Sequence, residues 1–126
     1  MKARETTLRI KQFAADEHTR KVANLESMIR DFNVMAADLD RQIQAEEDRT
    51  GNKDMTHFAY STFAKSATQR RNNLRASAAE LTGKLEAALK VRDEVMEELA
   101  QASATDPREQ LRVRRRSDRP VTAAVR

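Results

Sequence analysis

The sequence predicts an all-α protein, a long antiparallel two-helix coiled-coil hairpin followed by a disordered or irregular basic tail. Three observations support this fold class. Both prolines, Pro107 and Pro120, lie near the C-terminus, and the other cluster of helix breakers is confined to residues 50–57. Two arms of nearly equal length flank that cluster, and each repeats apolar residues at helical spacing. With 39% hydrophobic and 35% charged residues, the chain suits two helices that share a seam rather than a thick core.

The first helix is expected at about residues 5–49. Its apolar residues follow one another at alternating spacings of three and four, which is the a and d pattern of a coiled coil. These seam residues are Val22, Leu25, Ile29, Phe32, Ala36, Leu39 and Ile43. The same register continues toward the N-terminus through Leu8, Lys11, Ala15 and His18, where the predicted seam is less apolar.

A turn is expected at residues 50–56 and the second helix at about 57–103. Gly51 can adopt the left-handed backbone conformation that ends a helix, and Asp54 or Thr56 can cap the next one. The second seam contains Tyr60, Ala64, Ala67, Arg71, Leu74, Ala78, Leu81, Leu85, Ala88, Arg92, Val95, Leu99 and Ala102. The alternation of alanine with leucine favours a close approach of the two helices.

Charge placement favours antiparallel pairing of the two arms. If they fold back on each other, Lys21 falls opposite Glu86, and a basic stretch of the second arm faces an acidic run of the first. The basic stretch is Lys65, Arg70, Arg71 and Arg75, and the acidic run is Asp38, Asp40, Glu46, Glu47 and Asp48. Exposed ion pairs contribute about 0–1 kcal/mol each, so this pattern sets orientation more than stability.

The chain divides into a helical hairpin at residues 1–106 and an Arg-rich tail at residues 107–126. The tail carries seven arginines and two acidic residues, whereas residues 1–107 carry 17 basic and 18 acidic side chains and are nearly neutral. Arginine clusters bind phosphate through charge and counterion release. An alternative function is therefore a nucleic-acid-associated coiled coil that binds phosphates through this tail, and a solvated tail without a dedicated function is a third possibility.

The residue types that carry chemistry are sparse. The chain has no cysteine, its two glycines form no phosphate-binding loop, and His18 and His57 have no second ligand at metal spacing. His18 falls on the seam, where a polar residue specifies register, and His57 is expected to serve the start of the second helix. We expect no enzyme activity, no cofactor, no metal and no small-molecule substrate.

The N-terminal residues are charged and are not followed by the apolar stretch of a secretory signal. No window approaches the roughly 20 apolar residues of a membrane span. We therefore expect a soluble, cytoplasmic protein.

Aromatic residues cluster beside the turn. Phe58, Tyr60 and Phe63 lie close together in the sequence, and the register directs Tyr60 into the seam. Phe58 and Phe63 flank the seam beside Met55. This group predicts either a protein-contact surface at the end of the hairpin or a set of rings that folds over the turn and seals it.

Several segments of the first ninety or so residues form a recognisable pattern. The first are Met1-Lys2-Ala3-Arg4-Glu5 and Leu8-Arg9-Ile10-Lys11-Gln12-Phe13. The others are Met35-Ala36-Ala37-Asp38-Leu39-Asp40, Glu46-Glu47-Asp48-Arg49-Thr50-Gly51, His57-Phe58-Ala59-Tyr60, Ala64-Lys65 and Arg70-Arg71-Asn72-Asn73-Leu74. Through these segments the chain resembles the FliJ family of bacterial flagellar export proteins. The segment beside the turn is more specific than the heptads, because all coiled coils share those.

The resemblance implies a soluble, rod-like component of the flagellar type III export apparatus. Such a protein would lie in the cytoplasm, peripheral to the inner-membrane face of the flagellar base. It would link the hexameric export ATPase to the cytoplasmic domain of the export gate and would handle export chaperones. The candidate protein-binding residues are Phe58, Tyr60, Phe63, Lys65, Arg70 and Arg71.

The chain departs from the family at the C-terminus. Asp106-Pro107 interrupts the second helix, and an Arg-rich segment replaces the mixed-charge residues with which the family continues. A change of reading frame near residue 105 would produce such a junction. The sequence leaves the oligomeric state open, because the same stripes can close one hairpin, join two chains by domain exchange or build a filament.

Overall fold

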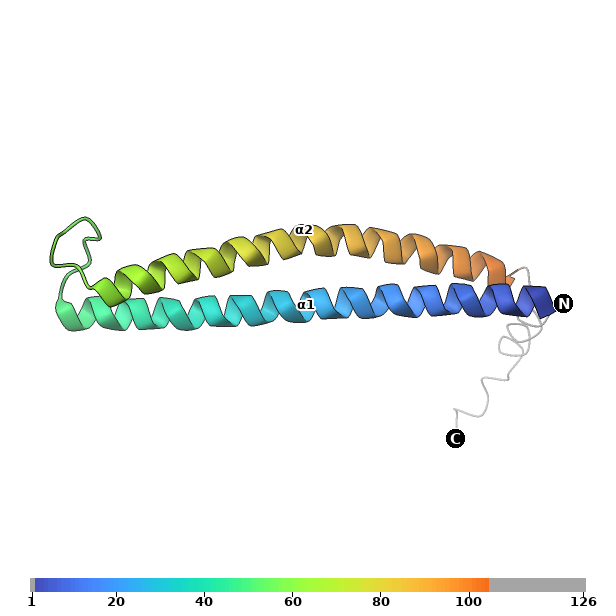
Figure 1. The fold of residues 1–126 in the computed structure, drawn as a ribbon, viewed down its shortest axis with the longest axis horizontal. Helices are drawn as coiled ribbons and strands as arrows, with labels where there is room; N and C mark the ends of the chain where they lie inside the picture. The colour runs from blue at the N-terminus through green and yellow to red at the C-terminus, as the bar shows by residue number, and fades with distance from the viewer. Residues whose placement is uncertain (1, 105–126) are drawn as a thin grey trace, which may run out of the picture. The chain divides into compact units, whose positions relative to one another are not determined.

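The computed structural model describes residues 2–104, and within them it is all-helical. Helix α1 spans Lys2–Thr50 and helix α2 spans Thr62–Ala104, and the two long helices pack against each other (Figure 1). No strand occurs among these residues. The predicted all-α class is therefore confirmed, whereas the predicted tail at residues 107–126 lies outside the described residues.

The chain forms two compact units, each with a segment of both helices. Unit 2 comprises Lys21–Leu89, and the described part of unit 1 comprises residues 2–20 and 90–104. In unit 2, Glu46 contacts Ser61 beside the connecting loop, and Asp40 contacts Arg71 farther from it. The α1 and α2 segments of unit 2 therefore run in opposite directions.

The heptad register placed its seam residues correctly on the covered side of both helices, although it missed Thr68, which is also buried. Every predicted seam residue of α1 and α2 is buried or half-buried, including those of the weak N-terminal seam in unit 1. The best-covered cluster in unit 2 consists of Ile43, Tyr60, Ala64 and Ala67, with Leu39 packed against it. Small alanines at the contact permit close packing of two helices that have few large apolar side chains to share.

Helix α1 ends at the glycine that the sequence indicated. Gly51 has a φ of 72°, and its N–H donates to the carbonyl of Glu47 at 2.9 Å, which closes the last turn in the left-handed capping motif. Arg49 lies in the same turn, where a positive charge interacts favourably with the helix dipole.

Replacing Gly51 with alanine is expected to destabilise the fold by roughly 1–2 kcal/mol, the cost of the left-handed conformation for a residue with a Cβ atom. An added Cβ meets no atom within 4 Å, so backbone strain is the sole cause. Gly83→Ala is the matched control, because Gly83 lies inside α2 with equally open surroundings and alanine should stabilise that helix by up to about 1 kcal/mol. Urea denaturation of both variants checks the opposite signs; equal shifts would contradict this account.

Helix α2 begins at Thr62, five residues later than predicted. The side chains of Asn52, Asp54 and His57 accept hydrogen bonds from backbone N–H groups two residues onward, at 3.1, 3.0 and 3.0 Å. Such local bonds compete with helix formation, so residues 51–61 form a longer loop than the predicted turn. The N-cap residue of α2 also differs from the prediction. Ser61 Oγ accepts a hydrogen bond from the N–H of Ala64 at 3.2 Å, so neither Asp54 nor Thr56 caps α2.

Part of the predicted charge pairing is present: two of the four basic residues of the second arm, Arg71 and Arg75, bind an acid of the first. In unit 2, Asp40 accepts hydrogen bonds from both Arg71, at 2.8 Å, and Arg75. The expected pair between Lys21 and Glu86 does not form among the described residues. Both side chains are exposed, and water competes effectively for such long, mobile groups.

Candidate protein-interaction site

The loop at residues 51–61 holds its aromatic residues in two different environments. Tyr60 is 8% exposed and belongs to the core cluster with Ile43 and Ala64. Phe58 is 96% exposed, although it lies two residues earlier. The prediction that Tyr60 enters the seam is therefore confirmed, and Phe58 does not seal the end of the structure.

Local hydrogen bonds keep Phe58 outside the core. The ring of His57 stacks on the ring of Phe58 with centroids 4.7 Å apart, and His57 Nδ1 accepts from the N–H of Ala59 at 3.0 Å. Asn52 Nδ2 also lies 3.3 Å from His57 Nδ1. The N–H of Tyr60 donates to the carbonyl of His57 at 3.0 Å. His57 therefore organises the loop rather than the start of α2, which was predicted at residue 57 and lies at Thr62.

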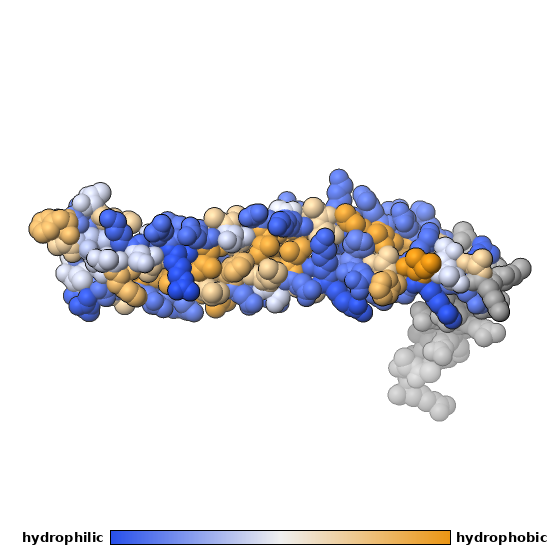
Figure 2. Space-filling model, viewed as in Figure 1, coloured by the Kyte–Doolittle hydropathy of each residue, from blue (hydrophilic) through white to orange (hydrophobic). Residues whose placement is uncertain are grey.

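Exposed apolar side chains gather around the loop. Met55 and Phe63 are both half-exposed or more, and Lys65 is exposed one turn into α2. We call Met55, Phe58, Phe63 and Lys65 the loop-end surface. Figure 2 shows hydrophobic atoms projecting at the end where the loop lies, beside hydrophilic neighbours. An apolar centre with charged surroundings is typical of a protein-contact surface.

Two of the six predicted contact residues are occupied within the fold. Tyr60 is in the core, and the Arg71 side chain is 23% exposed because its stem covers the seam while its guanidinium binds Asp40. Phe58, Phe63, Lys65 and Arg70 are exposed. Among the described residues neither Lys65 nor Arg70 has an ion-pair partner, so both charges are accessible.

The link between the loop and α1 was not anticipated from the sequence. Ser61 Oγ donates to Glu46 Oε1 at 2.9 Å while it accepts from the backbone of α2. The serine that directly precedes an apolar stretch is a cap signal that could have identified this residue. Hydrogen bonds from Arg49 and then Ser61 hold the pKa of Glu46 below its usual value. The hydrogen bond between Arg49 and Glu46 also raises the pKa of Arg49.

The lowered pKa of Glu46 predicts a pH dependence. The carboxylate stabilises the folded state above its unfolded pKa of 4.5, and this contribution is lost as the pH falls through the lower folded value. Glu46→Gln should therefore be less stable than the parent chain at neutral pH and indistinguishable from it in acid. The control is Asp31→Asn on the exposed side of α1. Urea midpoints at both pH values are the measurement, and a difference that persists in acid would contradict the role of the charge.

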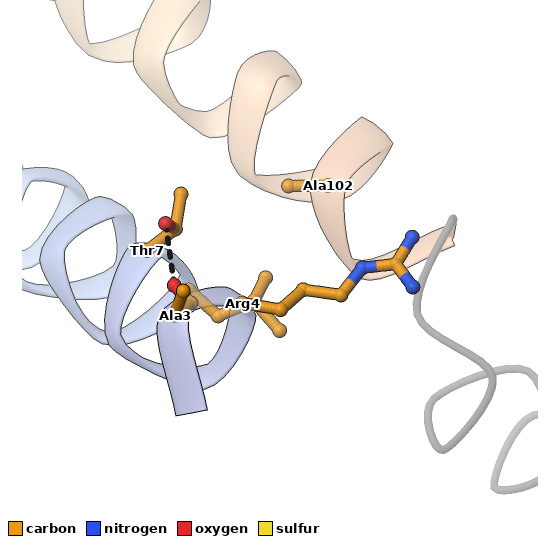
Figure 3. A pocket seen from close by; sticks show the side chains of 5 residues that line it. Ala3, Arg4, Thr7 and Ala102 are labelled. Atoms are coloured by element: carbon orange, nitrogen blue, oxygen red, sulfur yellow. Dashed lines mark hydrogen bonds between the residues drawn. The ribbon is translucent and has the colours of Figure 1, made fainter. Parts of the chain in front are cut away.

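Unit 1 contains a shallow hollow of about 300 Å³ between the ends of its two helical segments (Figure 3). Its lining consists of Ala3, Arg4, Thr7, Leu8 and Ala102. The Thr7 hydroxyl donates to the carbonyl of Ala3 at 2.8 Å, so this polar group is already paired within α1. Arg4 extends along the hollow toward the end of α2 in Figure 3. The described residues that line the hollow supply no convergent set of polar groups that would orient a small ligand.

The described residues contain no group of three or more potential metal-ligating side chains. No helix in the described part of the chain is long and apolar enough to cross a bilayer. Comparison with protein-family models, with curated proteins and with solved structures found no match to the chain.

Proposed function

We propose that this chain is an antiparallel coiled-coil hairpin that serves as a rod-like adaptor of the flagellar type III export apparatus, as its resemblance to the FliJ family implies. Its expected place is the cytoplasm, at the inner-membrane face of the flagellar base. Its expected partners are the hexameric export ATPase, the cytoplasmic domain of the export gate and the export chaperones. A stiff helical pair can connect such assemblies without carrying out chemistry itself.

The observation that carries the proposal is the exposure of Phe58 at the loop end, in a unit whose seam residues are covered. An exposed phenylalanine costs solvation free energy unless a partner buries it, and full burial of such a side chain contributes about 1.5–3 kcal/mol. Lys65, close by on α2, adds a positive charge that can steer an acidic partner.

The interaction test is co-purification of the full chain with the export ATPase and with the gate domain. The triple variant Phe58→Ala, Phe63→Ala, Lys65→Glu should weaken association with at least one of them by roughly tenfold or more. Val34→Ala with Arg30→Glu is the matched control, because both side chains lie on the exposed side of α1. Unchanged association of the triple variant with both partners would reject the loop-end surface, and failure of the parent chain to bind either would reject the proposed function.

A separate experiment tests whether the chain folds as a hairpin. The chain has no cysteine, so spin labels can be attached only to cysteines that are introduced. Spin labels at Arg9→Cys and Glu98→Cys should be close together, since packed helix axes lie roughly 8–10 Å apart. Dilution with unlabelled chain should leave the distance signal unchanged if the two labels belong to one molecule. A signal that disappears on dilution would indicate a domain-exchanged dimer, and no short distance at all would reject the hairpin.

A further inference from the structure

The two borders of the seam in unit 2 differ in composition. In an antiparallel helix pair, e positions of both helices share one border and g positions share the other. The e border contains the contact of Asp40 with Arg75, so its central charges are paired with each other. The g border has no such pair across the helices among the described residues.

The g border combines basic and exposed apolar side chains. We call six of its residues the basic border: Lys21, Met28 and Met35 on α1, and Arg70, Ser77 and Lys84 on α2. None of these is acidic. Met28 is 45% exposed and Met35 is 42% exposed, so the apolar stripe of α1 extends beyond the seam on this side. In Figure 2 hydrophobic atoms run along the line where α1 and α2 meet, between strongly hydrophilic side chains.

The spacing of the two methionines suits a third helix. Met28 and Met35 are one heptad apart, roughly 10 Å along α1, which is the repeat at which a coiled-coil partner places its own apolar residues. Methionine is flexible and polarizable, and it adapts to partner surfaces of different shape. By register, Ser77 and Lys84 fall beside Met28, and Arg70 and Ser77 fall beside Met35.

The charges of the basic border favour an acidic partner. Lys21 and Arg70 have no ion-pair partner among the described residues, and Lys84 reaches Glu80 only at 4.0 Å. Farther out on α1, Asp38 is paired with Arg41, whereas Asp31 is exposed and has no ion-pair partner among the described residues. An isologous contact between two basic borders would place these positive charges against one another, which disfavours a symmetric dimer through this surface.

We infer that the basic border binds an amphipathic helix of another protein whose apolar stripe is flanked by aspartate or glutamate. The partner's apolar residues cover Met28 and Met35, and its carboxylates approach Lys21, Arg70 and Lys84. This surface is distinct from the loop-end surface, and the inference does not depend on the proposed export function.

The test uses a labelled synthetic heptad peptide with leucine at its a and d positions and glutamate at its e and g positions. The glutamates repel one another and keep the peptide from pairing with itself. Fluorescence anisotropy with the full chain should show binding that weakens with added salt, and a peptide with lysine in place of glutamate should not bind. Equal binding of both peptides, or of neither, would overturn the inference.

Substitutions in the basic border test whether the acidic peptide binds there. Met28→Gln with Met35→Gln, and separately Lys21→Glu with Lys84→Glu, should each weaken binding of the acidic peptide by roughly tenfold. Val34→Gln and Arg30→Glu are the matched controls on the exposed side of α1, and circular dichroism verifies that every variant is folded. Controls that weaken binding as strongly as the border variants would overturn the inference.

Sedimentation of the chain without peptide tests whether a second copy of the chain covers the basic border instead. The parent chain and the Met28→Gln, Met35→Gln variant should sediment alike, because the basic border binds a different protein and not a second copy of the chain. If the parent chain self-associates and the methionine variant does not, a second copy covers this surface and the inference is overturned.

Discussion

Replacing Ala64 with glutamate is expected to destabilise the protein by about 3 kcal/mol or more, because it places a charge inside the contact between α1 and α2. Ala64 is 0% exposed and lies in the cluster with Ile43, Tyr60 and Ala67. A carboxylate at this position would lose its hydration without gaining a partner, and its volume would force the two helices apart. The measurement is the urea denaturation midpoint followed by far-ultraviolet circular dichroism.

Ala76→Glu is the matched control for this substitution. Ala76 is exposed on α2 in the same unit, so the same change of residue adds charge and volume in water. Its effect should stay within about 0.5 kcal/mol, as is usual for surface substitutions. Comparable destabilisation by both variants would mean that helix propensity, rather than burial at the contact of α1 and α2, determines the result.

Replacing Ile43 with alanine is expected to destabilise the protein by about 2–4 kcal/mol, the usual range for truncating a buried aliphatic side chain. Ile43 is 5% exposed and supplies the largest aliphatic side chain of the cluster beside the loop. Its truncation removes apolar burial and leaves a space that Tyr60 and the alanines of α2 cannot fill completely. Thermal and urea denaturation measure the loss, and hydrogen exchange should show faster opening of the loop end of unit 2.

Ile10→Ala is the control for the same chemical change. Ile10 lies on α1 but is 64% exposed, so its truncation removes little buried surface. We expect a shift of less than about 0.5 kcal/mol. A large effect at Ile10 would show that this part of the α1 surface is covered in solution, by a second copy or by another segment.

The candidate site was only partly predictable, as Phe58 and Arg71 illustrate. The sequence proposed both as contact residues, and the structure leaves Phe58 exposed while Arg71 binds Asp40. Arg71 also occupied a predicted seam position, so periodicity already indicated a structural role for its stem. The charge pattern placed Arg71 opposite the acidic run of α1, but it did not decide which of the basic residues would pair and which would remain in water.

The start of α2 shows a different limit of prediction. Asp54 and Thr56 are good capping residues by type. Within the loop, however, Asp54 accepts hydrogen bonds from the hydroxyl and then the backbone N–H of Thr56, and these bonds lower the pKa of Asp54. Ser61 caps the helix instead, because Tyr60 must reach the core cluster before the helix begins. Several residues were suitable N-caps for α2 by type, and the packing of the loop determined which of them caps the helix.

The sequence by itself determined the two helices, the glycine that ends α1 and the residues that line the seam. These features depend on local properties. Proline is disfavoured in a helix interior, glycine tolerates a positive φ, and heptad spacing aligns apolar side chains on one face. The tertiary structure alone decided which aromatic and charged groups remain accessible. Pairing of Asp40 with two arginines and exposure of Phe58 both depend on which side chain the other helix, or the loop, brings within reach.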